Sequence, residues 1–121
     1  MVYVDKVQYA KDSYGNELYI SEVMWTNSLY ENAWKRCSKA DMIRFINANS
    51  GHAHTKYVRG GRWCDGEEIH VVDNRYLRTD NNNIKADNLE TLPRYKFRRR
   101  GILSHRVLFY KDDENETLKI I

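Results

Sequence analysis

Hydrophobic positions near the N-terminus fall in two stretches that are rich in β-branched and aromatic residues. The stretches are residues 2–10 (VYVDKVQYA) and 18–25 (LYISEVMW). The segment KDSYGNE between them contains the turn signal Gly15-Asn16. This pattern predicts a β-hairpin at the start of the chain.

A helical pattern follows. Ser38 precedes Asp41 by three residues, which is typical of a helix N-terminus. The pattern stops at Asn49-Ser50-Gly51. Between these limits, four apolar residues have helical spacing, namely Met42, Ile43, Phe45 and Ile46. We therefore expect one main helix over about residues 39–49.

Shorter strands are predicted in the second half of the chain. Residues 56–59 (KYVR) form one, directly before Gly60-Gly61. Residues 68–72 (EIHVV) and 75–79 (RYLRT) form a second hairpin around the tight turn Asp73-Asn74.

The C-terminal third gives weaker patterns. Residues 86–92 are predicted to form one helical turn, because Pro93 disfavours helix in the residue before it. Residues 102–110 and 118–121 are predicted strands, separated by an acidic turn over residues 112–116. The fold class expected is α+β, with a mainly antiparallel sheet built from β-hairpins and packed with the main helix.

Length and composition fit one domain over residues 1–121. The chain has one proline and no linker-like stretch, and its 41% hydrophobic content can fill one modest core. It has no apolar run of about 20 residues, so we expect a cytoplasmic protein without a membrane partner. We expect Cys37 and Cys64 to stay reduced in that compartment.

The formal net charge of +3 is unevenly distributed. Residues 91–111 carry seven cations and no carboxylate, so the remaining residues sum to about −4. This basic segment indicates an anionic partner. Its cations are Arg94, Lys96, Arg98, Arg99, Arg100, Arg106 and Lys111.

Metal and nucleophilic chemistry are weakly supported. Cys37, His52, His54 and Cys64 are zinc-type residues, but they lack the paired spacing of structural zinc sites, so we expect no cofactor or metal. No G-x-S-x-G elbow is present, and neither cysteine has neighbours that would activate a thiolate.

The run from His70 to Leu92 resembles the tail of HNH-type homing endonucleases, in which an asparagine-rich stretch precedes a short helix beginning N-L-E. Those enzymes need a histidine general base and metal ligands. No histidine occurs between His70 and His105. We therefore expect no catalytic activity.

Arginines beside aromatic residues suggest phosphate recognition. The segment KYVRGGRW places Arg59 and Arg62 near Trp63, and RYLRT places Arg75 and Arg78 beside Tyr76. Guanidinium groups hold phosphate oxygens in pairs, and aromatic faces stack on bases. Exposed strands also carry such residues for solubility and cross-strand pairing, and both interpretations stay open.

The stretch from Trp34 to Pro93 resembles a family of small bacterial and phage proteins described as a domain of unknown function. The resemblance rests on the DMIRFINAN helix, the KYVRGG strand and turn, and three ordered motifs. Those motifs are Tyr76-Leu77-Arg78-Thr79, Asp87-Asn88-Leu89 and Leu92-Pro93. The motifs are alternatively structural, with Asp87 or Asn88 capping a short helix.

The chain also resembles the phage anti-Thoeris sponge family in its length, its β-hairpins and its helix. That resemblance implies a non-enzymatic homo-oligomer, a dimer or larger, that sequesters a cyclic ADP-ribose isomer or cyclic oligonucleotide and so blocks a bacterial defence. It implies arginines on the pyrophosphate, an aromatic face on adenine and an asparagine on a polar edge. The candidate ligand-binding residues are Arg59, Arg62, Tyr76, Arg78, Asn88 and Arg106.

Two alternatives remain. One is a protein-binding, anti-CRISPR-like inhibitor of a bacterial defence complex. The other is a degenerate HNH-like protein that binds nucleic acid, which the modest net charge does not favour.

Overall fold

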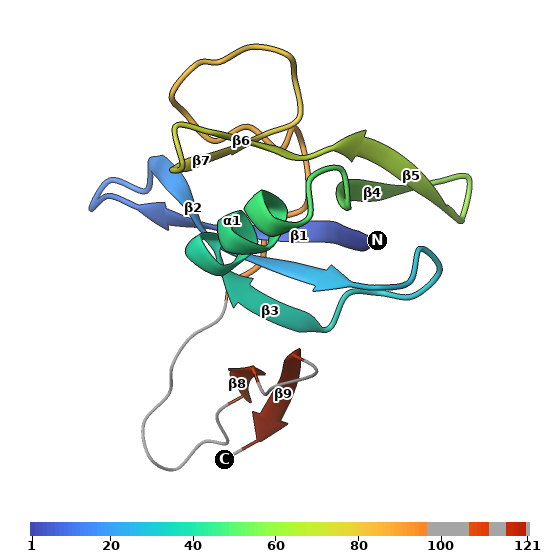
Figure 1. Ribbon diagram of the computed structural model, residues 1–121. Helices are drawn as coiled ribbons and strands as arrows, with labels where there is room; N and C mark the ends of the chain where they lie inside the picture. The colour runs from blue at the N-terminus through green and yellow to red at the C-terminus, as the bar shows by residue number, and fades with distance from the viewer. Residues whose placement is uncertain (97–106, 112–115, 121) are drawn as a thin grey trace.

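The computed structural model describes residues 1–96 and two further strands, β8 and β9 (Figure 1). The largest sheet has five strands in the order β3-β2-β1-β4-β5, and all its neighbours are antiparallel except β1 and β4. The structure thus confirms the α+β class with a mainly antiparallel sheet. The sheet strands are β1 (Val2–Lys11), β2 (Glu17–Thr26), β3 (Lys35–Ser38), β4 (Ala53–Arg59) and β5 (Arg62–Glu68).

One helix and two small hairpins complete the described chain. The helix α1 (Lys39–Ala48) connects β3 to β4. The hairpins are β6 (His70–Val72) with β7 (Tyr76–Arg78), and β8 (Val107–Lys111) with β9 (Glu116–Ile120). Among the described residues, no helix has the length and apolar character needed to cross a membrane.

The N-terminal hairpin and the helix form where the sequence predicts them. The side chain of Ser38 accepts a hydrogen bond from the Asp41 N–H at 3.1 Å and so caps α1. The helix buries Met42, Ile43 and Ile46, and it packs against β2 and β3 on one side and the β6–β7 hairpin on the other. This stripe joins the core formed by the inner faces of β1 and β2.

A β-bulge at Asp5 reshapes β1. Val4 pairs with Trp25 and Lys6 with Met24, so Asp5 is an extra residue whose side chain turns inward. Its carboxylate accepts the Ala33 N–H at 3.0 Å.

The buried side chain of Lys56 anchors the loop over residues 27–34 by hydrogen bonds to its backbone. It is fully buried, and its ammonium donates to the carbonyls of Ser28 at 3.0 Å, Leu29 at 3.3 Å and Glu31. The Trp63 ring centroid lies 4.0 Å from the same Nζ. Burial lowers the pKa of Lys56. The carbonyl oxygens and the indole face replace the water that a buried ammonium loses.

The predicted helical turn over residues 86–92 is wrong. Asn88 instead pairs with Arg78 in a parallel bridge, because its N–H donates to Leu77 O at 2.8 Å and its carbonyl accepts from Thr79 N at 3.1 Å. Glu90 follows at φ 59°, which ends any helical path. The segment runs alongside β7 and places Leu89 in the core.

The predicted strand over residues 68–72 is divided between β5 and β6, and most of β5 was not predicted. β5 contains Asp65, Gly66 and two glutamates, which are poor strand formers. Gly66 is required there, since a Cβ would lie 2.4 Å from Thr55 Oγ1 and 2.8 Å from its carbonyl oxygen. Close approach to β4 therefore overrides local propensity.

The C-terminal predictions are met in part. The strand predicted over residues 102–110 corresponds to β8, and that over 118–121 to β9. Residues 102–106, 112–115 and 121 lie outside the described residues.

Candidate functional site

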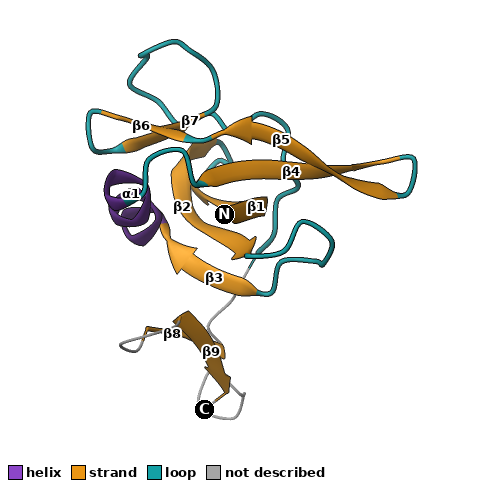
Figure 2. Ribbon diagram, turned by 45° about the vertical axis from the view of Figure 1, so that its right-hand side comes forward, coloured by secondary structure: helices purple, strands orange, loops and turns teal. Residues whose placement is uncertain are grey.

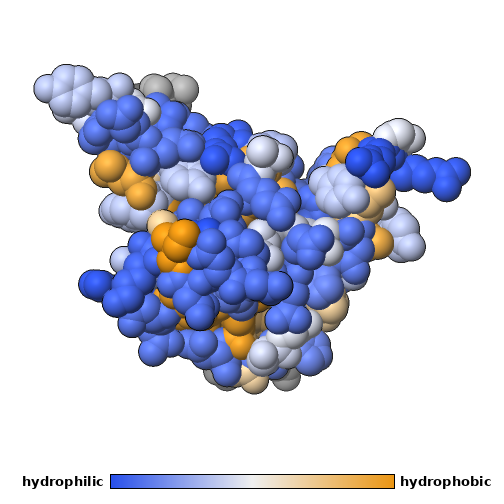
Figure 3. Space-filling view, turned by 90° about the horizontal axis from the view of Figure 1, so that it is seen from above, coloured by the Kyte–Doolittle hydropathy of each residue, from blue (hydrophilic) through white to orange (hydrophobic). Residues whose placement is uncertain are grey.

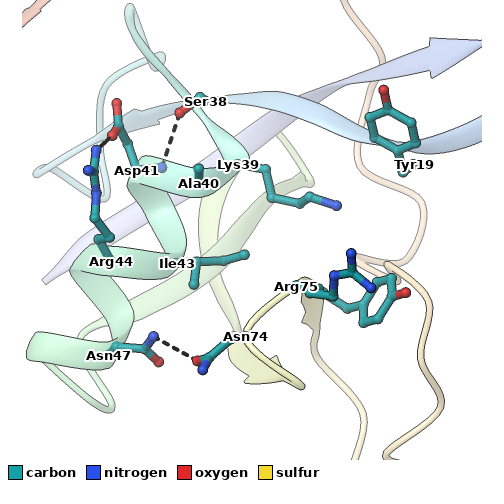
Figure 4. A pocket seen from close by; sticks show the side chains of 11 residues that line it. Tyr19, Ser38, Lys39, Ala40, Asp41, Ile43, Arg44, Asn47, Asn74 and Arg75 are labelled. Atoms are coloured by element: carbon teal, nitrogen blue, oxygen red, sulfur yellow. Dashed lines mark hydrogen bonds and ion pairs between the residues drawn. The ribbon is translucent and has the colours of Figure 1, made fainter.

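An open groove of about 800 Å³ lies between α1, β2 and the turn that joins β6 to β7 (Figure 4). Aromatic, cationic and amide side chains face it from all three elements. It is lined by Tyr19, Ser38, Lys39, Ala40, Asp41, Ile43, Arg44, Asn47, Asn74, Arg75 and Tyr76.

Lys39, the first residue of α1, lies between two tyrosine rings. Its Nζ is 5.2 Å from the ring centroid of Tyr19 and 5.6 Å from that of Tyr76. The same ammonium donates to Asp87 Oδ2 at 2.9 Å. The lysine is therefore held in place by one carboxylate and two aromatic faces.

The Asp87 carboxylate joins three elements at one edge of the groove. Its side chain is 1% exposed, and it accepts the backbone N–H of Ile20 in β2 at 2.7 Å and of Leu77 in β7 at 2.9 Å. With Lys39 from α1, it has three donors. These bonds satisfy a buried charge and keep Tyr19 and Tyr76 on either side of Lys39.

The β6–β7 turn supplies the opposite wall. Asp73 and Asn74 have φ values of 55° and 53°, which asparagine and aspartate tolerate, and Arg75 N closes the turn on Val72 O at 3.1 Å. Asn74 Oδ1 accepts from Asn47 Nδ2 at 3.1 Å, which ties the turn to α1. The turn thus presents the exposed Arg75 side chain to the groove.

The groove has a small positive excess. Arg44 forms an ion pair with Asp41, and Lys39 with Asp87. Arg75 has no carboxylate partner within the described part of the chain. Three cations and two carboxylates leave a net charge of +1.

Arg78 and Asn88 are engaged within the chain. Arg78 is 5% exposed; it donates to both carboxylate oxygens of Asp80 at 2.9 and 2.6 Å and to Ala86 O at 2.8 Å. Asn88 Nδ2 donates to Asp80 Oδ2 at 3.2 Å, and its Oδ1 accepts from Glu90 N at 3.0 Å. These bonds close the loop over residues 79–87.

The structure does not bring the predicted ligand-binding residues together in one place. Tyr76 lines the groove, whereas Arg59 and Arg62 lie at the tip of the β4–β5 hairpin, on the opposite side of the molecule from the β6–β7 turn (Figure 2). Arg106 lies outside the described residues. The groove residues outside the predicted ligand-binding set include Tyr19, Lys39 and Arg75, of which only Arg75 was considered for phosphate recognition.

Those residues leave only partial signals in the sequence. Arg75 lies in the RYLRT segment and Lys39 directly follows the predicted N-cap. Tyr19 lies in the first hairpin, 56 positions before Arg75, counting from the residue numbers. Nothing in the local pattern indicates that these three side chains meet.

The zinc-type residues form no cluster. Cys37 is buried and Cys64 half-buried, and no disulfide joins them. His54 Nδ1 lies 2.8 Å from Asp65 Oδ1, and His52 Nδ1 lies 3.1 Å from the carbonyl of Ser50. Within residues 1–96 and strands β8 and β9, no group of three or more potential metal ligands occurs.

No protein-family model, curated protein or solved structure matches the chain. The two family resemblances and the nuclease-like motif therefore stay predictions.

Proposed function

We propose that the protein binds a small, phosphate-bearing nucleotide in the groove between α1 and the β6–β7 turn, without converting it. The observation that carries this proposal is the exposed Arg75 guanidinium, which faces the groove without a carboxylate partner within the described residues. A planar guanidinium in this state can donate hydrogen bonds to two phosphate oxygens at once.

The tyrosines supply the second element of recognition. Tyr19 is 49% exposed and Tyr76 is half-buried, so each ring retains surface for a base to stack on. Stacking on an aromatic side chain contributes about 1–3 kcal/mol per base. A phosphate on Arg75 would lie in the groove that both rings line.

The charge of the groove favours a ligand with few negative charges. With Lys39 and Arg44 already paired, one positive charge remains for the ligand. A phosphodiester matches this charge better than a triphosphate does. A cyclic ADP-ribose isomer, with its pyrophosphate, and a cyclic oligonucleotide, with its phosphodiesters, have no terminal phosphate and carry one negative charge per phosphate.

The biological role proposed with it is anti-defence: a phage-type protein that holds the signal of a bacterial immune system. Sequestration needs tight binding and slow release, which preorganised polar contacts provide. Asp87 and the Asn47–Asn74 hydrogen bond hold the groove walls before any ligand arrives. A homo-oligomer that covers the open groove would slow release further, and this assembly is part of the proposal.

Native mass spectrometry tests the proposal directly. The protein is mixed with cyclic ADP-ribose isomers and cyclic di- and trinucleotides, and the bound ligand is released by denaturation. We expect recovery of an intact nucleotide and at least about a tenfold loss of affinity in Arg75→Ala, equivalent to about 1.4 kcal/mol.

The matched control is Arg59→Ala, which removes another exposed arginine, at the tip of the β4–β5 hairpin. It should bind the nucleotide as the unmodified protein does. Equal losses in the two variants would contradict the groove as the site. Failure of every nucleotide to bind, or recovery of a cleaved product, would contradict the proposed function.

A further inference from the structure

The β4–β5 hairpin ends in an arm, residues 57–64, that the nucleotide groove does not use. Gly60 and Gly61 form its two-residue turn with φ values of 59° and 75°, as a type I′ turn requires. A Cβ built on either glycine would have no atom within 4 Å. The tip therefore stands clear of the rest of the described chain.

Figure 3 shows this tip as a lobe at the right-hand side of the molecule. Strongly hydrophilic side chains extend from it, next to hydrophobic ones. Tyr57 and Val58 remain 43% and 57% exposed, and both arginines of the arm are exposed.

Arg59 and Arg62 are direct cross-strand partners. Residues in such a pair have Cβ atoms about 4.5–5.5 Å apart, and like charges placed there destabilise a hairpin. The arginine pair therefore lowers the stability of the hairpin, and residues that lower local stability in this way concentrate at functional sites. An anionic partner would convert the repulsion into attraction.

The other arginines make this pair unusual. Seven arginines occur in residues 1–96, and four of them form ion pairs with carboxylates. Arg59, Arg62 and the groove's Arg75 do not, within the described residues. The paired arginines are Arg36, Arg44, Arg78 and Arg94.

The base of the arm is anchored. The Trp63 ring centroid lies 4.0 Å from Nζ of the buried Lys56, which in turn binds three carbonyls of the loop over residues 27–34. This contact fixes the direction in which the ribbon projects. Arg59 and Arg62 are thus presented together by a supported ribbon.

We propose that the arm binds duplex DNA, with Arg59 and Arg62 on backbone phosphates at the edge of the major groove. The strands of such a ribbon lie about 4.7–4.9 Å apart, and the B-form major groove, about 12 Å wide, admits a two-stranded ribbon. This interaction is separate from nucleotide binding and does not depend on it.

Fluorescence anisotropy with the full chain and a labelled DNA duplex of about 20 bp tests the proposal between about 50 and 200 mM salt. The affinity of the unmodified protein should fall as salt rises. The double variant R59A/R62A should bind at least about tenfold more weakly at low salt, with a slope of log K against log[salt] that is smaller by about 2. R59K/R62K should keep the slope, because lysine retains the charge.

Arg75→Ala is the matched control, since it removes an exposed, unpaired arginine from the other side of the molecule. It should retain the affinity and the slope for DNA. Thermal unfolding checks that R59A/R62A remains folded, which we expect because both side chains are exposed.

Three results would overturn the proposal: no binding of DNA by the unmodified protein, an unchanged slope in R59A/R62A, or the same loss in Arg75→Ala. An RNA duplex of the same sequence provides a further test. Its major groove is deep and narrow, so weaker binding is expected. Equal affinity for RNA and DNA would be a fourth contrary result, because it would exclude insertion into the major groove. Nucleotide binding measured on the same variants keeps the two proposals distinguishable.

Discussion

Arg75 and Arg78 lie three residues apart in the same RYLR segment, yet the fold places them in opposite environments. Arg78 is buried, and its guanidinium makes three hydrogen bonds to Asp80 and to Ala86 O. Arg75 is exposed at a turn and faces the groove. The difference shows that an arginine beside a carboxylate takes a structural role, whereas one without a carboxylate partner is a candidate for ligand binding.

The same comparison gives a structural role to much of the Y-L-R-T and D-N-L pattern. Leu77 and Leu89 are core residues, Arg78 and Asn88 share Asp80, and Asp87 binds three donors. These residues close one loop onto the sheet. The motif therefore specifies how the chain returns to β1 and β2 after β7.

The largest loss of stability is expected when the buried Asp87 carboxylate, which accepts three hydrogen bonds, is neutralised. Asp87→Asn replaces one acceptor oxygen by an NH₂ group, which faces either the Leu77 N–H or both the Ile20 N–H and the Lys39 ammonium. Breaking a buried pair from one side costs about 3–5 kcal/mol, and we expect the free energy of unfolding to fall by that amount. Urea denaturation measures it.

The control for this variant is Asp73→Asn. Asp73 is half-exposed, and its Oδ2 lies 3.7 Å from Nζ of the exposed Lys85. Asparagine also tolerates the positive φ of residue 73 at this turn. Its effect should stay within about 0.5 kcal/mol. Similar losses in the two variants would show that burial does not distinguish these carboxylates.

A smaller loss of about 1–3 kcal/mol is expected for Lys56→Met, because the carbonyls of Ser28, Leu29 and Glu31 lose their shared donor. Urea denaturation of Lys56→Met and Lys11→Met compares a buried lysine with an exposed one. The Lys11 variant should remain within about 0.5 kcal/mol of the unmodified protein. If Lys56→Met lowered the free energy of unfolding equally little, we would conclude that water can replace the ammonium as the hydrogen-bond donor to the three carbonyls.

Local patterns predict most of the elements but not the candidate groove. The N-terminal hairpin, the Ser38-capped helix and the β6–β7 hairpin depend on turn and cap residues close in sequence, and all three form. The groove depends on contacts across the fold, such as Asp87 with Ile20. A predicted helical turn failed for the same reason, since bridging between Asn88 and Arg78 replaced local helical hydrogen bonds.

Alanine substitutions at Arg75 and Arg78 should affect different properties: the first should weaken nucleotide binding, and the second should lower stability. Arg78→Ala removes the donors that close residues 79–87, so its unfolding midpoint should fall and amide hydrogen exchange in that loop should rise. Arg75→Ala should leave the midpoint unchanged and lose nucleotide binding. The sequence alone predicts that Arg78→Ala keeps the fold and loses the ligand. Unchanged stability together with lost binding in Arg78→Ala would favour that prediction over the structural role.

The smallest effect concerns acid stability. Hydrogen bonds from Arg78 lower the pKa of Asp80 to about 2, from 3.8 without the fold, and the Asn82 N–H and the Asn88 side chain act in the same direction. The unfolded chain therefore takes up the proton first as pH falls, so the stabilisation is complete above about pH 4 and is lost toward about pH 2. Asp80→Asn removes this dependence. The difference in urea midpoint between the unmodified protein and Asp80→Asn should be largest near pH 5 and shrink as the pH falls toward 2. A difference that stays constant over this range would show that Asp80 acts through shape and neutral hydrogen bonds instead of its charge, and Arg78 would then no longer be distinguished from Arg75 by a charged partner.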